Sequence, residues 1–578
     1  MPIDLKKVKS CRIHPAIGIA RVGNHPTEFF VGPETPGLFT PPATYKSGTP
    51  PAIKRQGARF RIFAYDAKDK LLGELTAAEA TITWKVHLVN AKAEWDTFGG
   101  RDGETLPLDQ RRPGEQRNQS VTTGRESLII DGGVQTAGPN QTARFAGRFQ
   151  NKPVELGEIR CDADGRLVVL GGFGKSETLT GTLLTHYANN DGWHDDTSDG
   201  PVEASVVLTN GAKPGVAAAW VIVGPPDFVP GMTNVVTLWD AMLDMATTRG
   251  VVAAPANPSF TNDVYPILSR TVFLHWVSPL AASGHRPGRG GDFIAQWKTL
   301  ADKGKDGKDT RGFVFGMVRD PRLLAKFVSG KATEQEMEDA SAQANLSFMP
   351  SLSGDSGDEV TDPDKPPEPD TWLALTRRQY DILTLWKDGK FIADWKGVPP
   401  PPAPTITPEG LDRAALENCT GGPLFPGIEC GWILRHPEIY VEKTIARLNP
   451  SVLKAGDMTK RMAVPWQADF FECQQVWWPS QRPDITFGEA EFAKLMKLDQ
   501  QIAKAAQGST KRATLEQERA ALLFVRTPWW PRLWPNNDSP GDENKGDRAM
   551  VDRWHRLGYV VPKQSAGETV FVNTEFVA

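Results

Sequence analysis

The hydrophobic pattern of the chain changes near residue 235. Between residue 10 and about residue 240, β-branched and aromatic residues form short runs bounded by Gly, Pro, Asn and Asp. Such runs are typical of strands, and the density of turn residues between them favours antiparallel pairing. The clearest predicted strands are residues 59–65, 81–89, 166–170 and 204–208.

From Val235 onward, apolar residues recur three or four positions apart, which predicts helices. The clearest helical segments are 235–245, 261–270, 376–387, 411–419, 489–523 and 550–558. The segment 489–523 is broken at Gly508 and is predicted to form a hairpin of solvated helices. The sequence therefore predicts an α+β fold. A β-rich N-terminal region with antiparallel strands spans residues 1–240, and a mainly helical region with long loops spans residues 241–578.

Connections are marked by glycine, proline and charged residues. Residues 283–312, 351–369 and 397–408 are predicted to be exposed loops. The polar run 189–200 could imitate a metal-binding loop, but its spacing does not match the EF-hand pattern. An Asx-turn loop is the favoured interpretation of this run.

Composition narrows the class of protein. A chain of 578 residues exceeds one ordinary core, so two or more packed regions are expected. A net charge of −4 with interspersed signs argues against a nucleic-acid or polybasic membrane role. The five cysteines are odd in number and widely spaced, unlike a disulfide framework or a zinc site. Eighteen tryptophans predict large aromatic-lined surfaces.

The cellular location is predicted from the absence of two sequence features, a secretory signal and a transmembrane segment. Its first residues carry no apolar run of a secretory signal, and no window has the length of a transmembrane helix. We expect cytoplasmic synthesis and maturation, with export by a non-classical route left open.

The stretch 466–484 combines an acid, a thiol and several aromatic residues. Asp469 precedes Cys473 by four positions, so in a helix the two side chains would share one face. The aromatic neighbours would raise the pKa of the Asp469 carboxyl by desolvation, which suits a general base. The alternative is that Cys473 is a small buried hydrophobe and Asp469 a capping residue.

The sequence offers no GxGxxG fingerprint in a strand–turn–helix frame, so a flavin or dinucleotide site is not indicated. An amine oxidase needs a carbonyl electrophile that can store two electrons, which standard side chains lack. Such an enzyme would bind its cofactor in another way or build it from its own residues.

Residues 466–484 resemble the cofactor-bearing core of the LodA-like quinoproteins, amino-acid oxidases that carry cysteine tryptophylquinone. Four further motifs follow the family's order along nearly the whole chain: His14–Asn24, Phe30–Glu34, Cys419–Glu429 and Trp554–Tyr559. The resemblance covers both lysine ε-oxidase and glycine oxidase types, and leaves open whether an α- or ε-amine is oxidised.

The resemblance implies a quinone built from Cys473 and a tryptophan, with Trp554 as the favoured partner and Trp530 and Trp534 as alternatives. It implies that Asp469 helps to build the quinone and then takes a proton from the Schiff base formed with the substrate. Reoxidation by O2 would give a carbonyl product, ammonia and hydrogen peroxide.

Further site residues are expected by matching motifs. Phe228, Cys419 or Cys430, and His436 are candidates for the substrate pocket. Each has an alternative interpretation: a loop anchor for Phe228, a packed thiol for either cysteine, and a histidine bonded within its loop for His436. Glu429 and Arg482 are expected to hold the pocket together.

The family also implies a flavoprotein maturation partner and a homo-oligomer. Two rival functions remain. One is a quinone-dependent amine dehydrogenase that passes electrons to a carrier protein, and the other is a non-catalytic binding protein with tryptophan stacking surfaces.

Overall fold

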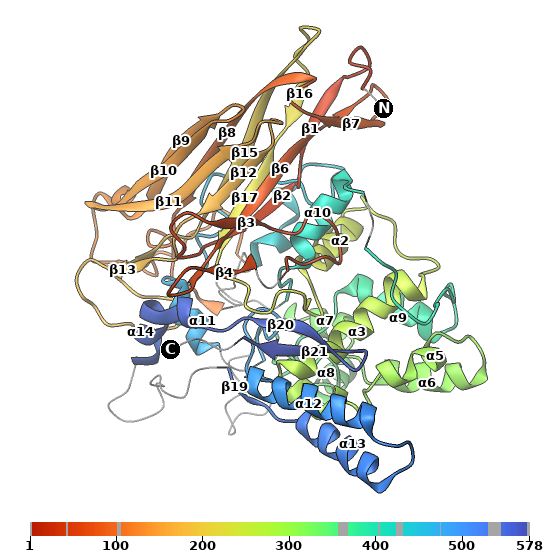
Figure 1. Cartoon of the computed structure of the whole chain (residues 1–578). Coiled ribbons are helices and arrows are strands. Elements are labelled where there is room, and N and C mark those ends of the chain that lie inside the picture. Colours follow the sequence, from red (N-terminus) through yellow and green to blue (C-terminus); the bar gives the residue numbers. More distant parts are fainter. Residues whose placement is uncertain are drawn as a thin grey trace.

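The computed structural model describes residues 3–41, 44–100, 106–356, 368–402, 405–422, 432–473, 476–529 and 545–574. Its N-terminal part is a large twisted sheet and its C-terminal part is mainly helical (Figure 1). This arrangement confirms the predicted α+β fold. Whether the two parts are separate domains with a boundary at residue 240 stays a prediction.

The sheet is built from strands that lie far apart in sequence. Its path runs β10-β11-β12-β6-β2-β17-β15-β8-β9, and most neighbours pair antiparallel, whereas β17 and β2 pair parallel. These strands are β2 (Ile17–Arg21), β6 (Arg55–Tyr65), β8 (Ala80–Asn90), β9 (Ile130–Ala137), β10 (Thr142–Phe149), β11 (Lys152–Cys161), β12 (Leu167–Gly171), β15 (Ser198–Leu208) and β17 (Ala219–Gly224). The four predicted strands correspond to β6, β8, β12 and β15, which confirms them.

The sheet curls into a barrel-like form because its two end strands, β9 and β10, lie against each other. A Cβ atom on Gly132 would come within 2.8 Å of Cβ of Phe145, and one on Gly147 within 2.6 Å of Ile130. Glycine is therefore required where the backbones approach. Along β8, Ile82 and alternate residues after it are buried, as a sheet covering a core requires.

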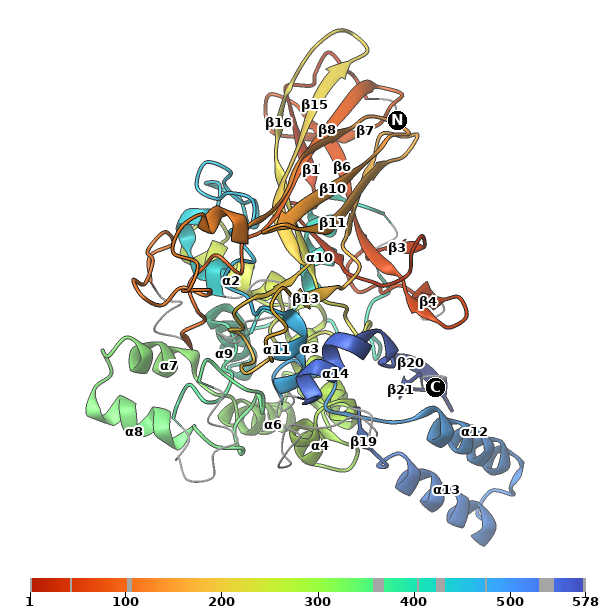
Figure 2. The same cartoon turned by 90° about the vertical axis from the view of Figure 1, so that its left-hand side faces the viewer.

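The helices follow the predicted segments closely. They include α2 (Leu238–Thr248), α3 (Tyr265–Phe273), α9 (Arg377–Lys387), α10 (Pro408–Glu417), and α14 (Lys545–Arg553). Both α2 and α9 begin with a capping box, at Thr237 and Thr376, which satisfies backbone N–H groups of the first turn. The predicted hairpin is confirmed as α12 (Glu489–Lys504) and α13 (Thr510–Leu522), which project from the body in Figure 2.

The prediction that residues 283–312 form an exposed connection was wrong. Residues 283–312 include the end of α4 (Pro279–His285), α5 (Trp297–Leu300) and the first part of α6 (Lys305–Gly316). Tertiary contacts stabilise these helices: the Trp297 ring packs on Tyr265 at 4.8 Å, and Trp386 Nε1 donates to the Leu300 carbonyl at 2.9 Å. The glycine and charged residues of 283–312 are typical of loops, so the sequence did not indicate these contacts.

The run 189–200 contains the predicted Asx turn, in which Asp195 Oδ1 accepts the Thr197 N–H at 3.2 Å, but it is not a loop throughout. It contains β14 (Trp193–Asp195) and the start of β15, and from Trp193 onward it is buried. Its carboxylates serve internal contacts described below. The loop 397–408 is confirmed over its described residues, where neither helix nor strand occurs before α10. For 351–369, only residues 351–356 and 368–369 are described.

The two parts of the molecule share a core. Helix α10 packs on β2, and one cluster of buried hydrophobic residues includes members from the sheet, from α3 and α9, and from the C-terminal hairpin β20 (Val560–Ser565) and β21 (Glu568–Asn573). Within the described ranges, no helix combines the length and apolarity needed to cross a membrane. Nor do their His, Cys, Asp and Glu side chains gather in groups of three that could hold a metal.

Candidate active site

The helix α11 (Trp466–Glu472) carries the acid and leads directly to the thiol. Asp469 and Cys473 are both buried, at 2% and 3% exposure. Cys473 Sγ lies 3.1 Å from Asp469 Oδ1, and the Cys473 amide donates to the Asp469 carbonyl at 3.0 Å. The four-residue spacing therefore brings a carboxyl and a thiol into contact in a water-poor site.

The beginning of α11 is held by a buried ion pair from the β-rich region. Asp195 Oδ2 accepts the backbone N–H of Trp466 at 3.1 Å and pairs with Lys92 Nζ at 2.9 Å. A carboxylate is stabilised at a helix N-terminus by the helix dipole. Burial lowers the pKa of Lys92, while the charges of Asp195 and Asp469 favour its protonated form.

A second link ties the same end to the loop before β13 (Ser176–Thr178). Gln467 Nε2 donates to the Gly174 carbonyl at 3.1 Å, and Ser176 Oγ donates to Gln467 Oε1 at 2.6 Å. The polar side chains of the 189–200 run and this loop thus position the helix.

The end of α11 is held by a buried guanidinium. Arg482, 2% exposed, donates to the carbonyls of Phe470 and Phe471, the latter at 3.4 Å, and lies 3.6 Å from Asp484 Oδ1. Burial lowers the pKa of Arg482, whereas the charges of Asp484, Cys473 and Asp469 favour its charged form. The expected supporting role of Arg482 is compatible with this placement beside the thiol.

Val476, three positions after Cys473, has an unusual backbone conformation. Val476 has φ 50°, a conformation that a β-branched residue rarely adopts. Its N–H donates to Asp484 Oδ2 and its carbonyl accepts the N–H of Ser353, both at 3.0 Å. Val476 is thereby held from two sides. Burial raises the pKa of Asp484 to about 7.

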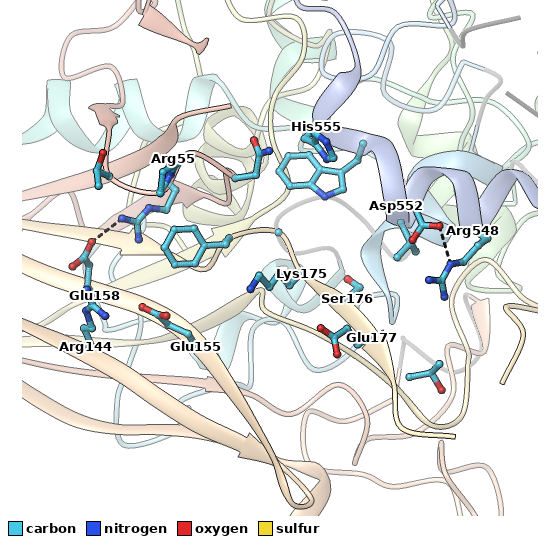
Figure 3. A pocket seen from close by; sticks show the side chains of 18 of the residues that line it. Arg55, Arg144, Glu155, Glu158, Lys175, Ser176, Glu177, Arg548, Asp552 and His555 are labelled. Carbon is cyan, nitrogen blue, oxygen red and sulfur yellow. Dashed lines mark hydrogen bonds and ion pairs between the residues drawn. The ribbon is translucent and has the colours of Figure 1, made fainter. Parts of the chain in front are cut away.

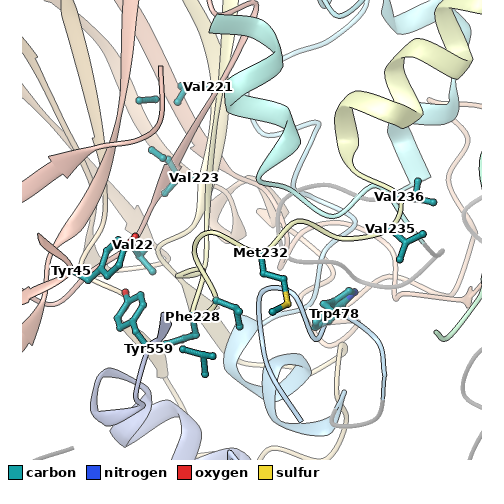
Figure 4. Close-up of a cluster of buried hydrophobic side chains, with 14 of the residues drawn as sticks. Val22, Tyr45, Val221, Val223, Phe228, Met232, Val235, Val236, Trp478 and Tyr559 are labelled. Carbon is teal, nitrogen blue, oxygen red and sulfur yellow. The ribbon is translucent and has the colours of Figure 1, made fainter. Parts of the chain in front are cut away.

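Aromatic rings enclose this end of the helix. Phe228 is fully buried and its ring lies 5.9 Å from Phe470, 5.1 Å from Trp529 and 5.0 Å from Tyr559, all between ring centroids. Figure 4 shows Phe228 and Tyr559 in the same buried cluster as Trp478. The Arg482 guanidinium lies 5.6 Å from the Trp529 ring centroid. Sequence reasoning did not single out Trp529; its place beside Trp530 in the run Pro528–Pro531 was the signal that could have found it.

Trp554 is placed at the other end of α11. It begins the short helix η9 (Trp554–Arg556), and its ring packs edge-on against Trp466 at 5.5 Å. Gly174 allows this approach, since a Cβ there would lie 2.1 Å from Cζ2 of Trp554. Trp466 and Cys473 are seven positions apart, which corresponds to a rise of about 10 Å along a helix.

Trp554 also lines a cavity of about 1040 Å³ between the sheet and α14, shown in Figure 3. Charged residues of both signs line it: Arg55, Arg144, Glu155, Glu158, Lys175, Glu177, Arg548 and Asp552. Ion pairs on its walls include Arg55 with Glu158 at 2.7 Å, Arg160 with Glu158 at 2.8 Å and Arg548 with Asp552 at 3.0 Å.

Cys419 and His436 lie away from this cavity. Cys419 follows α10, is buried, and its Sγ lies 3.5 Å from the Ala415 carbonyl and 3.7 Å from an Arg21 nitrogen. His436 Nδ1 is 3.2 Å from Glu438, while its buried Nε2 has no hydrogen-bond partner among the described residues. Both residues lie close in sequence to the lining of a smaller cavity of about 350 Å³, which includes Gly421 and Arg435. Glu429, Cys430, Trp530 and Trp534 lie outside the described residues.

Comparison with known proteins agrees with this architecture. Two family models match, "L-Lysine epsilon oxidase N-terminal" over residues 14–223 and "L-lysine epsilon oxidase C-terminal domain" over residues 350–489. The chain is 28% identical over 540 residues to the L-lysine 6-oxidase of Marinomonas mediterranea, covering 80% of this chain and 70% of that protein.

Solved structures show the same fold. A crystal structure of the L-Lys epsilon-oxidase from Marinomonas mediterranea in its Schiff base intermediate with L-Lys superimposes with a TM-score of 0.69 at 23% identity. A second structure of that organism's epsilon-lysine oxidase gives 0.70 at 24%. Both matches cover 98% of this chain and 95% of the other. The chain belongs to the LodA-like family of amino-acid oxidases.

Proposed function

We propose that this protein oxidises a primary amine of an amino acid with a quinone built from Cys473 and a tryptophan, and returns the electrons to O2. The products would be a carbonyl compound, ammonia and hydrogen peroxide. The observation that carries the proposal is the buried contact of 3.1 Å between Cys473 Sγ and Asp469 Oδ1. The curated relative acts on L-lysine by its name, which makes L-lysine the first substrate to test.

The residues around Cys473 fit such a cofactor. When formed, the quinone supplies a carbonyl electrophile that can accept two electrons. The thiol is buried, a carboxyl group adjoins it, and Phe228, Phe470 and Trp529 exclude water from the same space.

Asp469 is placed to act as the general base. Its carboxyl group adjoins the sulfur that would carry the cofactor, so it can remove a proton from a substrate carbon held there. Arg482 fixes the end of the helix and therefore orients both side chains. Phe228, Cys419 and His436 remain predicted contributors to the substrate pocket.

Several tryptophans are candidates for the residue that is joined to Cys473. Trp554, the partner expected from its motif, packs on Trp466 at the beginning of α11. Trp529 lies instead in the cluster of Arg482 and Phe470, at the same end as Cys473. Trp530, the next residue in the sequence, and Trp534 lie outside the described residues. Trp554 stays the partner expected from its motif, with Trp530 and Trp534 as alternatives.

Intact-mass measurement and peptide mapping of the purified protein test the cofactor and its partner together. We expect a peptide that joins Cys473 to one tryptophan and carries added oxygen, and we expect it to disappear in Cys473→Ser. Hydrogen peroxide should form from L-lysine with no other acceptor added. A native chain whose mass equals that of the unmodified sequence would refute the proposal.

The resemblance extends the proposal to partners. A flavoprotein would be required to complete the quinone, and the enzyme would form a homo-oligomer. Expression with and without such a flavoprotein, followed by mass and size measurements, would test both.

A further inference from the structure

Two charged residues that are separated only by Pro483, Arg482 and Asp484, contact the chain on either side of Cys473. Before Cys473, the Arg482 guanidinium donates to two backbone carbonyls in the last turn of α11. After Cys473, Asp484 Oδ2 accepts the backbone N–H of Val476 at 3.0 Å. We call this pair of side chains the Arg482–Asp484 clamp.

The backbone of Val476 needs such support. Among the described residues other than glycine that have a positive φ, Val476 is the only β-branched one. It is 1% exposed, so water does not reach it. A β-branched residue keeps this conformation only where the surrounding contacts outweigh its cost. The hydrogen bond from Val476 to Asp484 is one of these contacts.

The clamp places two opposite charges in a buried position. The side chains of Arg482 and Asp484 are 2% and 8% exposed, and Arg482 Nη1 lies 3.6 Å from Asp484 Oδ1. Burial raises the pKa of Asp484, whereas the charge of Arg482 and the Val476 N–H oppose that rise. The same guanidinium is close enough to Cys473 and Asp469 for their charges to act on it. The clamp therefore lies beside the acid–thiol pair as well as along the chain that carries the pair.

The backbone of Asp484 fixes the clamp to two further segments. Its N–H donates to the Val277 carbonyl at 3.0 Å, and its carbonyl accepts the Trp529 N–H at 3.1 Å. The next two residues form β18 (Ile485–Thr486), which pairs with β19 (Thr527–Pro528). A side chain positions another group well only when its own backbone is held firmly. The Asp484 carboxylate meets this condition.

We propose that Asp484 is a positioning residue, which sets the place of Cys473 Sγ relative to the Asp469 carboxyl through its hydrogen bond to Val476. This inference rests on the proposed function and deepens it. Arg482 holds the chain before the thiol and Asp484 holds the chain after it, so loss of Asp484 leaves Cys473 held on one side. A displacement of about 1 Å can slow a reaction 10²-fold, so the loss should affect the reaction more than the binding of substrate.

The test replaces Asp484 by alanine, which removes the acceptor for the Val476 N–H. In Asp484→Ala, the fraction of folded protein with a cross-linked Cys473, measured by intact mass, should fall at least fivefold. The kcat of the cross-linked fraction should fall about tenfold, with the KM for the amino acid within twofold of the wild type.

Asp96→Ala is the matched control. Asp96 is also a buried carboxylate with two contacts of the same kind, an ion pair with Arg111 at 2.9 Å and a backbone N–H accepted from Arg112 at 2.7 Å. It lies in the loop after β8, so its loss should cost stability but leave the cross-linked fraction and kcat within twofold of the wild type.

Asp484→Asn separates the hydrogen bond from the charge, because its side-chain oxygen can still accept the Val476 N–H. This variant should retain at least half of the wild-type cross-linked fraction. Should Asp484→Ala give no folded protein, Asp484→Ser replaces it, since the shorter side chain cannot reach Val476. A cross-linked fraction and kcat equal to those of Asp96→Ala would overturn the inference, as would an Asp484→Asn enzyme no better than Asp484→Ala.

Amide hydrogen exchange over residues 476–481 tests the clamp without relying on the cofactor. The variants are compared in the Cys473→Ser background, where no cross-link can form. Exchange should be at least tenfold faster with Asp484→Ala and unchanged with Asp96→Ala. If this holds while the native chain carries no cross-link, the proposed function fails and the role of Asp484 stands. A cross-linked native chain in which Asp484→Ala changes neither the exchange nor kcat would leave the oxidase in place and remove that role.

Discussion

The two ends of helix α11 are held by different kinds of interaction. At its beginning, Asp195 of β14 accepts the Trp466 N–H and pairs with Lys92, which follows β8 in the sequence. At its end, Arg482 binds backbone carbonyls among the rings of Phe470 and Trp529. The first end is anchored by charge and the second is enclosed by aromatic surface.

We therefore expect the beginning of α11 to contribute mainly to stability and its end to contribute mainly to the reaction. A buried ion pair contributes little when intact, but loss of one partner leaves an uncompensated charge. Changes at the beginning of α11 should therefore destabilise the fold. The proposed reacting groups, Asp469 and Cys473, lie at the end, where surrounding aromatic rings exclude water and electrostatic interactions are stronger. Changes there should alter the reaction.

The largest effect is expected for Asp469→Asn. If Asp469 is the general base, kcat per assembled cofactor should fall about 10²- to 10⁴-fold. Oxygen consumption, normalised by the visible absorption of the quinone, measures this. Asp309→Asn, the same change at an exposed position of α6, should leave kcat unchanged. Retention of more than a tenth of kcat would exclude Asp469 as the base.

Lys92→Met should have the largest effect on stability. It leaves the Asp195 carboxylate buried without its cation, which costs about 3–5 kcal/mol of unfolding free energy. Urea unfolding measures the loss, with the exposed Lys305→Met of α6 as control. The folded fraction should still contain the Cys473 cross-link. Unchanged stability together with a missing cross-link would reverse the proposed division between the two ends.

A pH dependence is expected from Asp196, beside Asp195. Burial raises the pKa of Asp196 to about 7 from an ordinary value of 3.8. Because the folded state holds the proton more tightly, this stability is fully present below pH 3.8 and is lost as the pH rises toward 7. Asp196→Asn should therefore raise the unfolding free energy at pH 8 by about 2–4 kcal/mol and change it little at pH 4. Parallel pH profiles for the two proteins would contradict this.

The smallest effect is expected for Phe228→Leu at the aromatic end. Loss of three ring contacts should lower the unfolding free energy by about 1–2 kcal/mol. Thermal unfolding measures the change, and the KM for the amino acid is measured on the same samples. A raised KM at unchanged stability would identify Phe228 as a substrate contact, whereas lower stability at unchanged KM would identify an anchor of its loop.

Local patterns predicted the secondary structure well. The alternation of β8 and the capping residues Thr237 and Thr376 act within a few positions of the chain, so they can be recognised in sequence. The helices of segment 297–316 were not predicted from the sequence, because they depend on contacts with Trp386 and Tyr265, which are distant in sequence.

The contact between Asp469 and Cys473 could be predicted because helical periodicity alone brings residues four apart together. The sequence by itself therefore determined the α+β pattern and the acid–thiol pair. Only the tertiary structure decided that Lys92 and Arg482 hold the two ends of α11 and that Trp529 lies at the end with Cys473. These contacts join residues tens to hundreds of positions apart, and their packing leaves no periodic signal along the chain.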